Sequence, residues 1–499
     1  MSRAPILTTA ELRAVETRAS KRPGATLMER AGHAAAEAAR RLAPDTGAPI
    51  LVVAGPGNNG GDAWVAAARL VEIFHRVTVC DVTGGEPKAP EARAAKAQFA
   101  TRGGNVVREW PAQLRPALVL DGLLGIGIVR DVDGALAEVV RKINASAAPV
   151  LAVDVPSGLD SETGSIHGVA VRAAHTITFI ARKVGLHTAD GLDCCGTIEV
   201  DDLGLADDLR DSPGSLLTPE SVRGWLVPRL RNSHKGDFGT VGVIGGNRGM
   251  VGAALLASRS ALMAGAGKVY VGLLASDAAA VDPVHPELML RPIDDVLLAD
   301  VIVAGPGAGQ SPSATSVSMF ERNILPNVIA AAKPIVLDAD ALNAIAFSET
   351  LEKELAANRN APTVLTPHPA EAARLLHRTT EEVQGNRLAA AVDLARRFKA
   401  HVVLKGAGSV CAFPDGRWSV NSTGNPGLAS GGTGDVLAGM VGALLAQGLR
   451  PDRALEYAVC LHGAAADACV ARGDGPAGLT ASEVMQGARR VLNAWVAGR

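Results

Sequence analysis

The sequence has few aromatic side chains and no excess of charge of either sign. Phe, Trp and Tyr make up 3% of its 499 residues, and the formal net charge is -2. Proteins that bind nucleic acids usually carry a basic face, and those that hold single strands stack the bases on aromatic rings. The composition therefore argues against a nucleic-acid partner, and we expect the ligands to be small molecules.

Paired cysteines and long apolar runs are also absent. None of the six cysteines forms a CxxC pair, a pattern that fits inert thiols in a reducing compartment. No stretch reaches the roughly 18 uninterrupted apolar residues of a membrane span, and residues 1–7 lack the apolar core of a secretory signal. We expect a cytoplasmic protein without a membrane partner.

The chain does have a regular alternation of short apolar runs with amphipathic stretches, which is typical of α/β domains with mostly parallel sheets. Residues 201–219 are rich in Asp, Gly and Pro, and we place a domain boundary there. Before it, strands are expected at residues 50–54, 77–82, 117–120, 150–153 and 176–180, with helices at 8–41 (one or two, capped by Thr8 or Thr9), 62–74 and 134–144. After it, strands are expected at residues 240–244, 268–271, 301–304, 334–337, 363–366 and 402–405.

A glycine-rich loop follows the first of these strands. Residues 55–62 read Gly-Pro-Gly-Asn-Asn-Gly-Gly-Asp, which matches neither the GxGxxG fingerprint nor the P-loop with its Lys-Ser/Thr pair. The N–H groups of such a loop and the amides of Asn58 and Asn59 suit a phosphate or a ribose, whereas carbonyl oxygens suit a cation. A plain turn between a strand and a helix is the alternative.

Two further loops begin with a carboxylate at a strand end. Residues 121–127 read Asp-Gly-Leu-Leu-Gly-Ile-Gly, and residues 154–160 read Asp-Val-Pro-Ser-Gly-Leu-Asp. A lone Asp at such a place is often a helix cap, but three loops at one sheet edge indicate a ligand site. Oxygen donors from Asn59, Asp121 and Ser157 suit an alkali or alkaline-earth ion, and their few formal charges favour K⁺. A nucleophilic Ser157 is disfavoured because no GxSxG elbow surrounds it.

These three motifs, in this order, resemble those of the NAD(P)H-hydrate epimerase domain over most of residues 1–210. The resemblance implies a Rossmann-like, doubly wound sheet in which Asn59, Asp121 and Ser157 hold K⁺, and Asp154 touches the substrate and is the acid/base candidate. Ala63 and Ile126 stand where Gly and Thr are usual in that family. The implied substrate-binding residues are Asn58, Asn59, Gly60, Gly61, Asp62, Gly125, Ile126, Gly127, Ile128, Val129, Arg130, Asp131 and Asp154.

Glycine-rich or charged loops also follow the expected strands of the second half. They span residues 245–254, 304–309, 365–371 and 405–409. Each cluster alone is a weak signal, because His368 between two prolines could be a turn residue and Lys405 could be a surface charge. Several such loops at one sheet edge suggest a nucleotide cleft.

Residues 425–435 carry the most informative motif, Asn-Pro-Gly-Leu-Ala-Ser-Gly-Gly-Thr-Gly-Asp, ahead of an apolar helix expected from Val436. Glycines let N–H groups approach a phosphate, and a helix N-terminus adds a favourable dipole. A carboxylate beside an anion is unfavourable unless it takes part in the chemistry, so Asp435 is a candidate catalytic base. A tight turn with Asp435 as an ordinary N-cap is the alternative.

This half resembles the ADP-dependent NAD(P)H-hydrate dehydratase family of the ribokinase-like superfamily over residues 222–495. The resemblance rests on residues 233–239 (Ser-His-Lys-Gly-Asp-Phe-Gly), 366–369 (Thr-Pro-His-Pro), 405–408 (Lys-Gly-Ala-Gly) and 425–435. It implies that the hydrated nucleotide contacts Ala253, Gly307, His368 and Asp435, and that ADP or AMP contacts Lys405, Gly406, Ala407, Gly408, Ser409 and Gly434. Together the halves resemble bifunctional NAD(P)H-hydrate repair enzymes.

The combined resemblance implies repair of NADHX and NADPHX, which carry a hydroxyl at C6 of the hydrated nicotinamide ring. Phosphorylation of that hydroxyl by ADP with Mg²⁺, activated by Asp435, would create a leaving group, and the epimerase half would convert the R form into the S form that the dehydratase accepts. A homo-oligomer is expected.

Two rival interpretations stay open at this point. A small-molecule kinase of the ribokinase group, such as a thiazole or sugar kinase with an accessory nucleotide-binding domain, would explain Asp435 but not the Asn58–Asn59 loop. A non-catalytic nucleotide-binding or RNA-scaffold protein is the other, although near-neutral charge and scarce aromatic residues count against RNA. Fold alone would not decide among them, because function belongs to sites.

Overall fold

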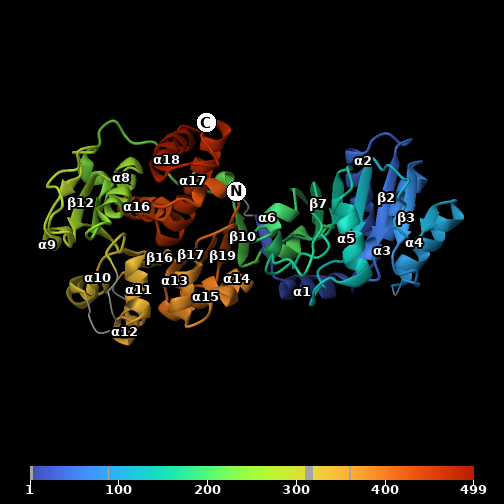
Figure 1. The fold of residues 1–499 in the computed structure, drawn as a ribbon, viewed down its shortest axis with the longest axis horizontal. Helices are drawn as coiled ribbons and strands as arrows, with labels where there is room; N and C mark the ends of the chain where they lie inside the picture. Colours follow the sequence, from blue (N-terminus) through green and yellow to red (C-terminus); the bar gives the residue numbers. More distant parts are fainter. Residues whose placement is uncertain (1–3, 88, 310–317, 359–360, 499) are drawn as a thin grey trace. The chain divides into compact units, whose positions relative to one another are not determined.

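The computed structural model describes residues 4–87, 89–309, 318–358 and 361–498. The chain divides into two compact units between Ser212 and Pro213, and each is described by itself. Both units are layers of helices on a mostly parallel sheet (Figure 1), which confirms the α/β class expected from the sequence.

The sheet of the N-terminal unit has the strand order β4-β3-β2-β5-β6-β7-β9, and every neighbouring pair is parallel. The order reverses at β2, so the loops after β2 and β5 open at a switch point where ligands commonly bind. A separate parallel pair joins β1 to β8. The strands are β1 (Ala4–Leu7), β2 (Pro49–Ala54), β3 (Arg76–Asp81), β4 (Asn105–Val107), β5 (Leu118–Gly122), β6 (Val150–Val153), β7 (His175–Phe179), β8 (Arg182–Lys183) and β9 (Thr197–Asp201).

Helices cover both faces of this sheet because its strands alternate their side chains between two apolar layers. Ile50 and Val52 pack with residues of α2 and α3, whereas Leu51 and Val53 pack with residues of α5 on the other face. Thr8 begins α1 with a capping box to Glu11. The helices are α1 (Thr9–Ala19), α2 (Leu27–Leu42), α3 (Asn58–Glu72), α4 (Pro90–Thr101), α5 (Gly134–Asn144) and the short α6 (Gly191–Cys194).

The sheet of the C-terminal unit runs in the order β13-β12-β11-β14-β15-β16-β17-β18-β19-β10. It is parallel from β13 to β17, turns antiparallel through β18 and β19, and ends with β10 parallel to β19. The strands are β10 (Gly214–Leu217), β11 (Thr240–Gly245), β12 (Lys268–Leu273), β13 (Met289–Leu290), β14 (Val301–Ala304), β15 (Ile335–Leu337), β16 (Thr363–Leu365), β17 (His401–Leu404), β18 (Val410–Ala412) and β19 (Trp418–Asn421).

Four apolar helices, α8, α16, α17 and α18, contribute most of the helical side of the largest core of this unit. Its helices are α7 (Pro219–Val222), α8 (Val251–Met263), α9 (Ile293–Val296), α10 (Leu325–Ala330), α11 (Asp340–Ala346), α12 (Glu349–Ala357), α13 (Pro369–Leu376), α14 (Thr380–Gly385), α15 (Arg387–Phe398), α16 (Thr433–Ala446), α17 (Pro451–Ala471) and α18 (Ala481–Val496). Within the described part of the chain, only α17 is long and apolar enough to cross a membrane, and 72% of its most apolar window is buried inside the protein.

The structure corrects several expectations drawn from the sequence. The supposed linker at residues 201–219 contains the buried strand β10, which pairs with β19 through residues far away in the sequence. The strands β1, β4, β8, β9, β13, β18 and β19 were not expected. The helix expected from Val436 begins three residues earlier, at Thr433. Asp435 therefore lies in the first turn of α16, and Gly432 rather than Asp435 is the N-cap.

Candidate functional sites

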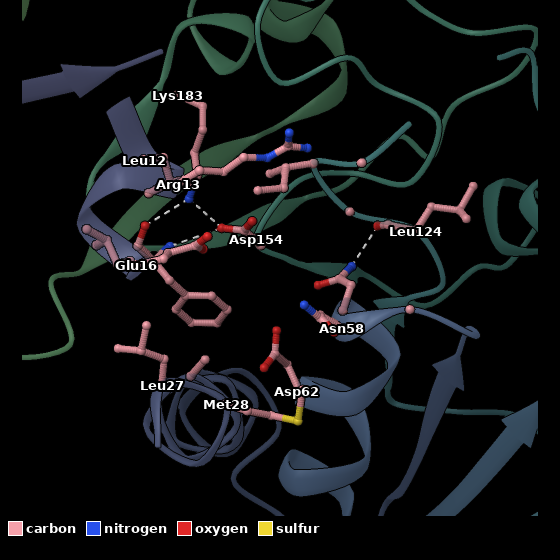
Figure 2. A pocket seen from close by; sticks show the side chains of 18 of the residues that line it. Leu12, Arg13, Glu16, Leu27, Met28, Asn58, Asp62, Leu124, Asp154 and Lys183 are labelled. Carbon is pink, nitrogen blue, oxygen red and sulfur yellow. Dashed lines mark hydrogen bonds and ion pairs between the residues drawn. The ribbon is translucent and has the colours of Figure 1, made fainter. Parts of the chain in front are cut away.

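A cavity of about 640 Å³ opens at the switch point of the N-terminal sheet (Figure 2). Side chains from α1, α2 and α3 form one part of its wall, and the loops after β2, β5 and β6 form another. Of the residues expected to bind the hydrated nucleotide, those that line it are Asn58, Asn59, Asp62, Gly125, Ile126, Gly127, Ile128 and Asp154.

The other expected substrate-binding residues do not line this cavity. Gly60 is a packing position, since a Cβ there would lie 1.9 Å from the carbonyl oxygen of Gly55. Gly61 packs against Met28 in the same way. The side chains of Val129 and Asp131 are 87% and 78% exposed, and Arg130 is also exposed. Direct contact between these five residues and a ligand stays a prediction.

The three expected cation ligands do lie together at the sheet edge. The Ser157 hydroxyl donates to Asp121 Oδ1 at 2.6 Å, and the Ser157 N–H donates to Asp121 Oδ2 at 2.9 Å. The Asn59 amide donates to the carbonyl of Leu124 at 2.6 Å, and the Leu124 N–H in turn donates to Ser157 Oγ at 2.8 Å. Three loops are thereby joined around one small polar centre.

Two observations show that this centre suits a cation. Asn59 Oδ1 is buried and has no hydrogen-bond partner among the described residues, a condition that costs free energy unless a ligand is present. Asp121 is fully buried, the Leu123 and Ser157 groups that donate to it are neutral, and burial raises the pKa of its carboxyl. A weakly charged set of oxygen donors fits an alkali cation better than a transition metal.

Asp154 is held by a lysine that the sequence analysis missed. The Lys183 ammonium donates to Asp154 Oδ1 at 2.5 Å, to Thr178 Oγ1 at 2.7 Å and to the carbonyl of Phe179 at 2.8 Å. The lysine side chain is only 2% exposed. Asp154 itself has a positive φ of 65°, a conformation that is strained for a residue other than glycine and that clusters at functional sites.

In the C-terminal unit, the expected site residues follow the carboxyl ends of β11, β14, β16 and β17 or lie in the first turn of α16. Ala253, near the start of α8, lies beside Gly307, since a Cβ on Gly307 would be 2.9 Å from the Ala253 Cβ. Gly434 faces the Lys405 ammonium, which would be 3.2 Å from a Cβ at that position. A positive charge therefore lies next to the N-terminus of α16, and the pair forms a favourable place for a phosphate.

Lys405 is held in place by Asp338, another residue that the sequence analysis missed. Asp338 is 1% exposed, and its Oδ1 accepts from Lys405 Nζ at 2.9 Å and from the Thr366 hydroxyl at 2.7 Å. Burial alone would lower the pKa of Lys405, but the charges of Asp338 and Glu371 outweigh it and raise the pKa. The lysine is therefore a fixed cation.

Asp435 has the electrostatics of a general base that works near neutral pH. Burial, and then the negative charge of Asp338, raise the pKa of Asp435 to about 7, although Lys405 acts in the opposite direction. Glu371 shows the same effect, because burial raises its pKa to about 7. A pKa near the working pH is what efficient proton transfer needs.

His368 is the N-cap of α13, and both of its ring nitrogens have partners. Nδ1 accepts from the N–H groups of Ala370 and Glu371 at 3.1 and 3.4 Å, and Nε2 lies 3.3 Å from Glu371 Oε1. Burial and the charge of Lys405 lower the pKa of the ring, so it is neutral with its proton on Nε2. The ring face and edge, rather than a free nitrogen, are what His368 offers a ligand.

The loop after β17 is held by hydrogen bonds to its backbone carbonyl groups. Arg387 donates to the carbonyls of Leu404 and Lys405 at 3.3 and 3.2 Å, and the Ser409 hydroxyl donates to the carbonyl of Gly406 at 3.0 Å. This arrangement holds Gly406, Ala407 and Gly408 as a short backbone turn beside Lys405. The turn is suited to approach phosphates through N–H groups.

Comparison with known proteins covers both units. A family model described as YjeF-related protein N-terminus matches residues 24–185, and a model described as NAD(P)H-hydrate dehydratase matches residues 241–486. The bifunctional NAD(P)H-hydrate repair enzyme Nnr of Escherichia coli is 37% identical over 478 residues, which cover 94% of this chain and 89% of that protein. The enzyme of the same name from Coxiella burnetii is 37% identical over 480 residues, with 94% of each chain covered.

Two solved structures each match part of the chain. The ADP/ATP-dependent NAD(P)H-hydrate dehydratase of Bacillus subtilis, co-crystallised with ATP and Mg²⁺, is 33% identical and covers 56% of this chain and 98% of its own, with a TM-score of 0.49. The yeast protein ynu0 is 23% identical and covers 36% of this chain and 82% of its own, with a TM-score of 0.33.

Proposed function

The chain belongs to the family of bifunctional NAD(P)H-hydrate repair enzymes, and from that premise we propose how its two sites divide the reaction. The enzyme is an NAD(P)H-hydrate epimerase and dehydratase. A stand-alone ribokinase-group kinase would account for the C-terminal half alone, whereas the relatives match across both halves. We assign epimerisation to the cavity of the N-terminal unit and dehydration to the cluster around Asp435.

In the dehydratase site, Asp435 accepts the proton of the C6 hydroxyl while that oxygen takes a phosphoryl group from ADP, which leaves as AMP. Loss of phosphate from C6 and of a proton from C5 then restores the ring double bond. The N–H groups at the start of α16 and the Lys405 ammonium stabilise the transferring phosphoryl group. The observation that carries this assignment is the raised pKa of a carboxyl placed beside an anion site.

Mg²⁺ would enter this site with the nucleotide. Among the described residues, no group of three His, Cys, Asp or Glu side chains is placed to hold a metal ion by itself. When bound, the ion would neutralise phosphate charge, as it commonly does while keeping several waters and one or two carboxylates. Asp338 and Glu371 are the nearby carboxyl groups that the site supplies.

The dehydratase rate should depend on pH through Asp435. The base must be ionised, so kcat/KM for the S-hydrate should rise about tenfold per pH unit below its pKa of about 7 and level off above it. The measurement is the return of NADH absorbance with saturating ADP across this range, with ADP affinity determined at each pH as a control. A profile that is flat from about one unit below to one unit above this pKa would contradict the assignment.

In the epimerase site, we propose that Asn59, Asp121 and Ser157 hold K⁺. The support is the buried Asn59 oxygen, which has no hydrogen-bond partner among the described residues, and the buried Asp121 carboxyl, which accepts from neutral groups of Leu123 and Ser157. When bound, the ion would supply the positive charge that this centre lacks. Because the three residues come from the start of α3, the end of β5 and the loop after β6, the ion would also hold these segments together beside the cavity.

Asp121→Ala should therefore remove the response to K⁺. In the wild-type chain, K⁺ should raise the thermal midpoint of the N-terminal unit and speed R-to-S conversion, relative to the same concentration of choline. In the variant both effects should be lost, whereas dehydration of pure S-hydrate should be unchanged. Equal loss of both activities, or a wild-type epimerase indifferent to K⁺, would show that the cation assignment is wrong.

A further inference from the structure

The epimerase cavity is bordered by more ionisable groups than one acid/base residue requires. Glu16 and Arg13 reach it from α1, Asp62 from α3, and Asp154 and Lys183 from the region after β6 and β7. Figure 2 shows Asp62 rising from α3 toward the same space that Asp154 borders from the other side. Three carboxyl groups therefore border this cavity together with only two basic side chains, one of which, Lys183, already donates all of its protons.

The contacts of Asp154 leave one of its oxygens available. Oδ1 accepts from Lys183 Nζ at 2.5 Å, and from the Thr178 hydroxyl and the Phe179 N–H at 3.2 Å each. Among the described residues, Oδ2 has no such partner. The three acceptors around Lys183 use all the protons of its ammonium. Lys183 is thus a positioning residue that fixes Oδ1 of Asp154 and leaves Oδ2 open to a ligand.

Asp62 lacks contacts of the kind that hold Asp154. Within the described part of the chain, its carboxyl has no hydrogen bond or ion pair, and the charged groups near it are Asp154, Glu16 and Lys183. Burial, followed by the negative charges of Asp154 and Glu16, raises the pKa of Asp62 well above its usual range, and Lys183 offsets only part of this. Asp62, whose surroundings favour its protonated form, and Asp154, which Lys183 fixes through Oδ1, border one cavity from opposite sides, as expected of an acid/base pair.

We propose, on the basis that this cavity is the epimerase site, that Asp62 is a second catalytic residue and that epimerisation proceeds by loss and return of water at C6. The C6 carbon bears both the hydroxyl and the ring nitrogen N1. Asp62 donates a proton to the hydroxyl on one ring face, the C6–O bond breaks, and the N1 lone pair forms a C6–N1 double bond. The departing hydroxyl leaves as water.

Return of water completes the reaction. A water molecule adds to C6 from the opposite face, the C6–N1 π electrons return to N1, and Asp154 Oδ2 takes the released proton. The sum of the two steps is an inverted C6 with no net gain or loss of atoms. Asp154 is then protonated and Asp62 is ionised, which is the state needed for the reverse conversion. In that conversion Asp154 donates the proton to the hydroxyl and Asp62 takes the proton released by water.

Oxygen exchange with solvent tests this mechanism on the full-length wild-type chain. No nucleotide is added, so that dehydration does not take place. In oxygen-18-labelled water, each conversion of R-hydrate into S-hydrate should place one solvent oxygen at C6, as measured by mass spectrometry of the separated epimers. Conversion that retains the original oxygen would overturn the proposal, because it would mean that the C6–O bond never breaks.

Substitutions then distinguish the role of Asp62 from that of Asp154. Asp62→Asn and Asp154→Asn should each slow epimerisation by about 10²–10⁴-fold, Asp62→Glu should recover part of the loss, and Glu72→Gln at the exposed end of the same helix should have no effect. Wild-type kcat/KM should fall as the pH rises through the raised pKa of Asp62, and the residual rate of Asp62→Asn should lack that fall. Because the raised pKa means that the ionised carboxyl costs free energy in the folded state, Asn should not lower the thermal midpoint.

The outcomes distinguish this inference from the site assignment. If Asp154→Asn is slow but Asp62→Asn is normal, Asp62 is not a catalytic residue and only the inference fails. If both variants epimerise normally, the cavity is not the epimerase site. If Asp62→Asn unfolds, the oxygen-exchange result and the fall in wild-type kcat/KM with rising pH still decide the question.

Discussion

Asp435→Asn is expected to reduce dehydration by about 10²–10⁴-fold, the usual cost of removing a group that transfers a proton in the transition state. Asn has the same shape but cannot accept the proton of the C6 hydroxyl. The substitution should not unfold the unit, because burial and Asp338 already make the ionised Asp435 costly, as its pKa of about 7 indicates. ADP affinity should be retained, since Lys405 and the turn after β17 are untouched.

The measurement is the rate at which S-hydrate returns to NADH with saturating ADP, compared with Asp294→Asn at the exposed start of α9. Epimerisation by the same Asp435→Asn chain serves as the internal control for folding and should be unchanged. A variant that binds ADP and still dehydrates S-hydrate at a near-normal rate would show that Asp435 is not the base.

The sequence was sufficient to predict those features that depend on residues close together in the chain. Apolar runs such as residues 150–153 and 301–304 became strands with those limits, and the loops that follow strands did meet at the sheet edges. The rule that a carboxylate directly after a strand indicates a site would also have found Asp338, which follows β15 (Ile335–Leu337). It was missed because no glycine cluster accompanies it.

Other features depend on tertiary contacts that no local pattern encodes. Lys183 lies 29 residues after Asp154 and reaches it through the turn between β7 and β8. The start of α16 was misplaced because Gly434 disfavours a helix in isolation, whereas packing of α16 on α8 overrides that preference. Cytoplasmic location and the absence of membrane or nucleic-acid partners stay predictions from composition, and self-association stays an expectation.

The domain boundary is the expectation with the most direct experimental consequence. Domains of 1–210 and 222–495 were expected from the family resemblances, and a boundary at 201–219 from composition, but β10 lies between the two domains and all four of its residues are buried. A fragment that starts at residue 220 would expose the edge of β19 and the apolar surface that β10 covers. We therefore expect a fragment from Pro213 onward to have a higher thermal midpoint than one from Glu220 onward.

Separated at Ser212, the two units should each keep one activity, because each has its own core and its own set of site residues. The C-terminal fragment should dehydrate S-hydrate with ADP and consume R-hydrate only at its spontaneous rate of epimerisation. The N-terminal fragment should interconvert the epimers without nucleotide. Epimer-resolved chromatography over time measures both.

Full-length variants test the same division if a fragment is insoluble. Asp154→Asn alone should consume only S-hydrate rapidly, and Asp435→Asn alone should epimerise without producing NADH. An equimolar mixture of the two chains should convert both epimers completely, because a freely diffusing intermediate can pass from one chain to the other. A C-terminal fragment, or an Asp154→Asn chain, that consumes R-hydrate as fast as S-hydrate would place the epimerase activity outside the N-terminal cavity.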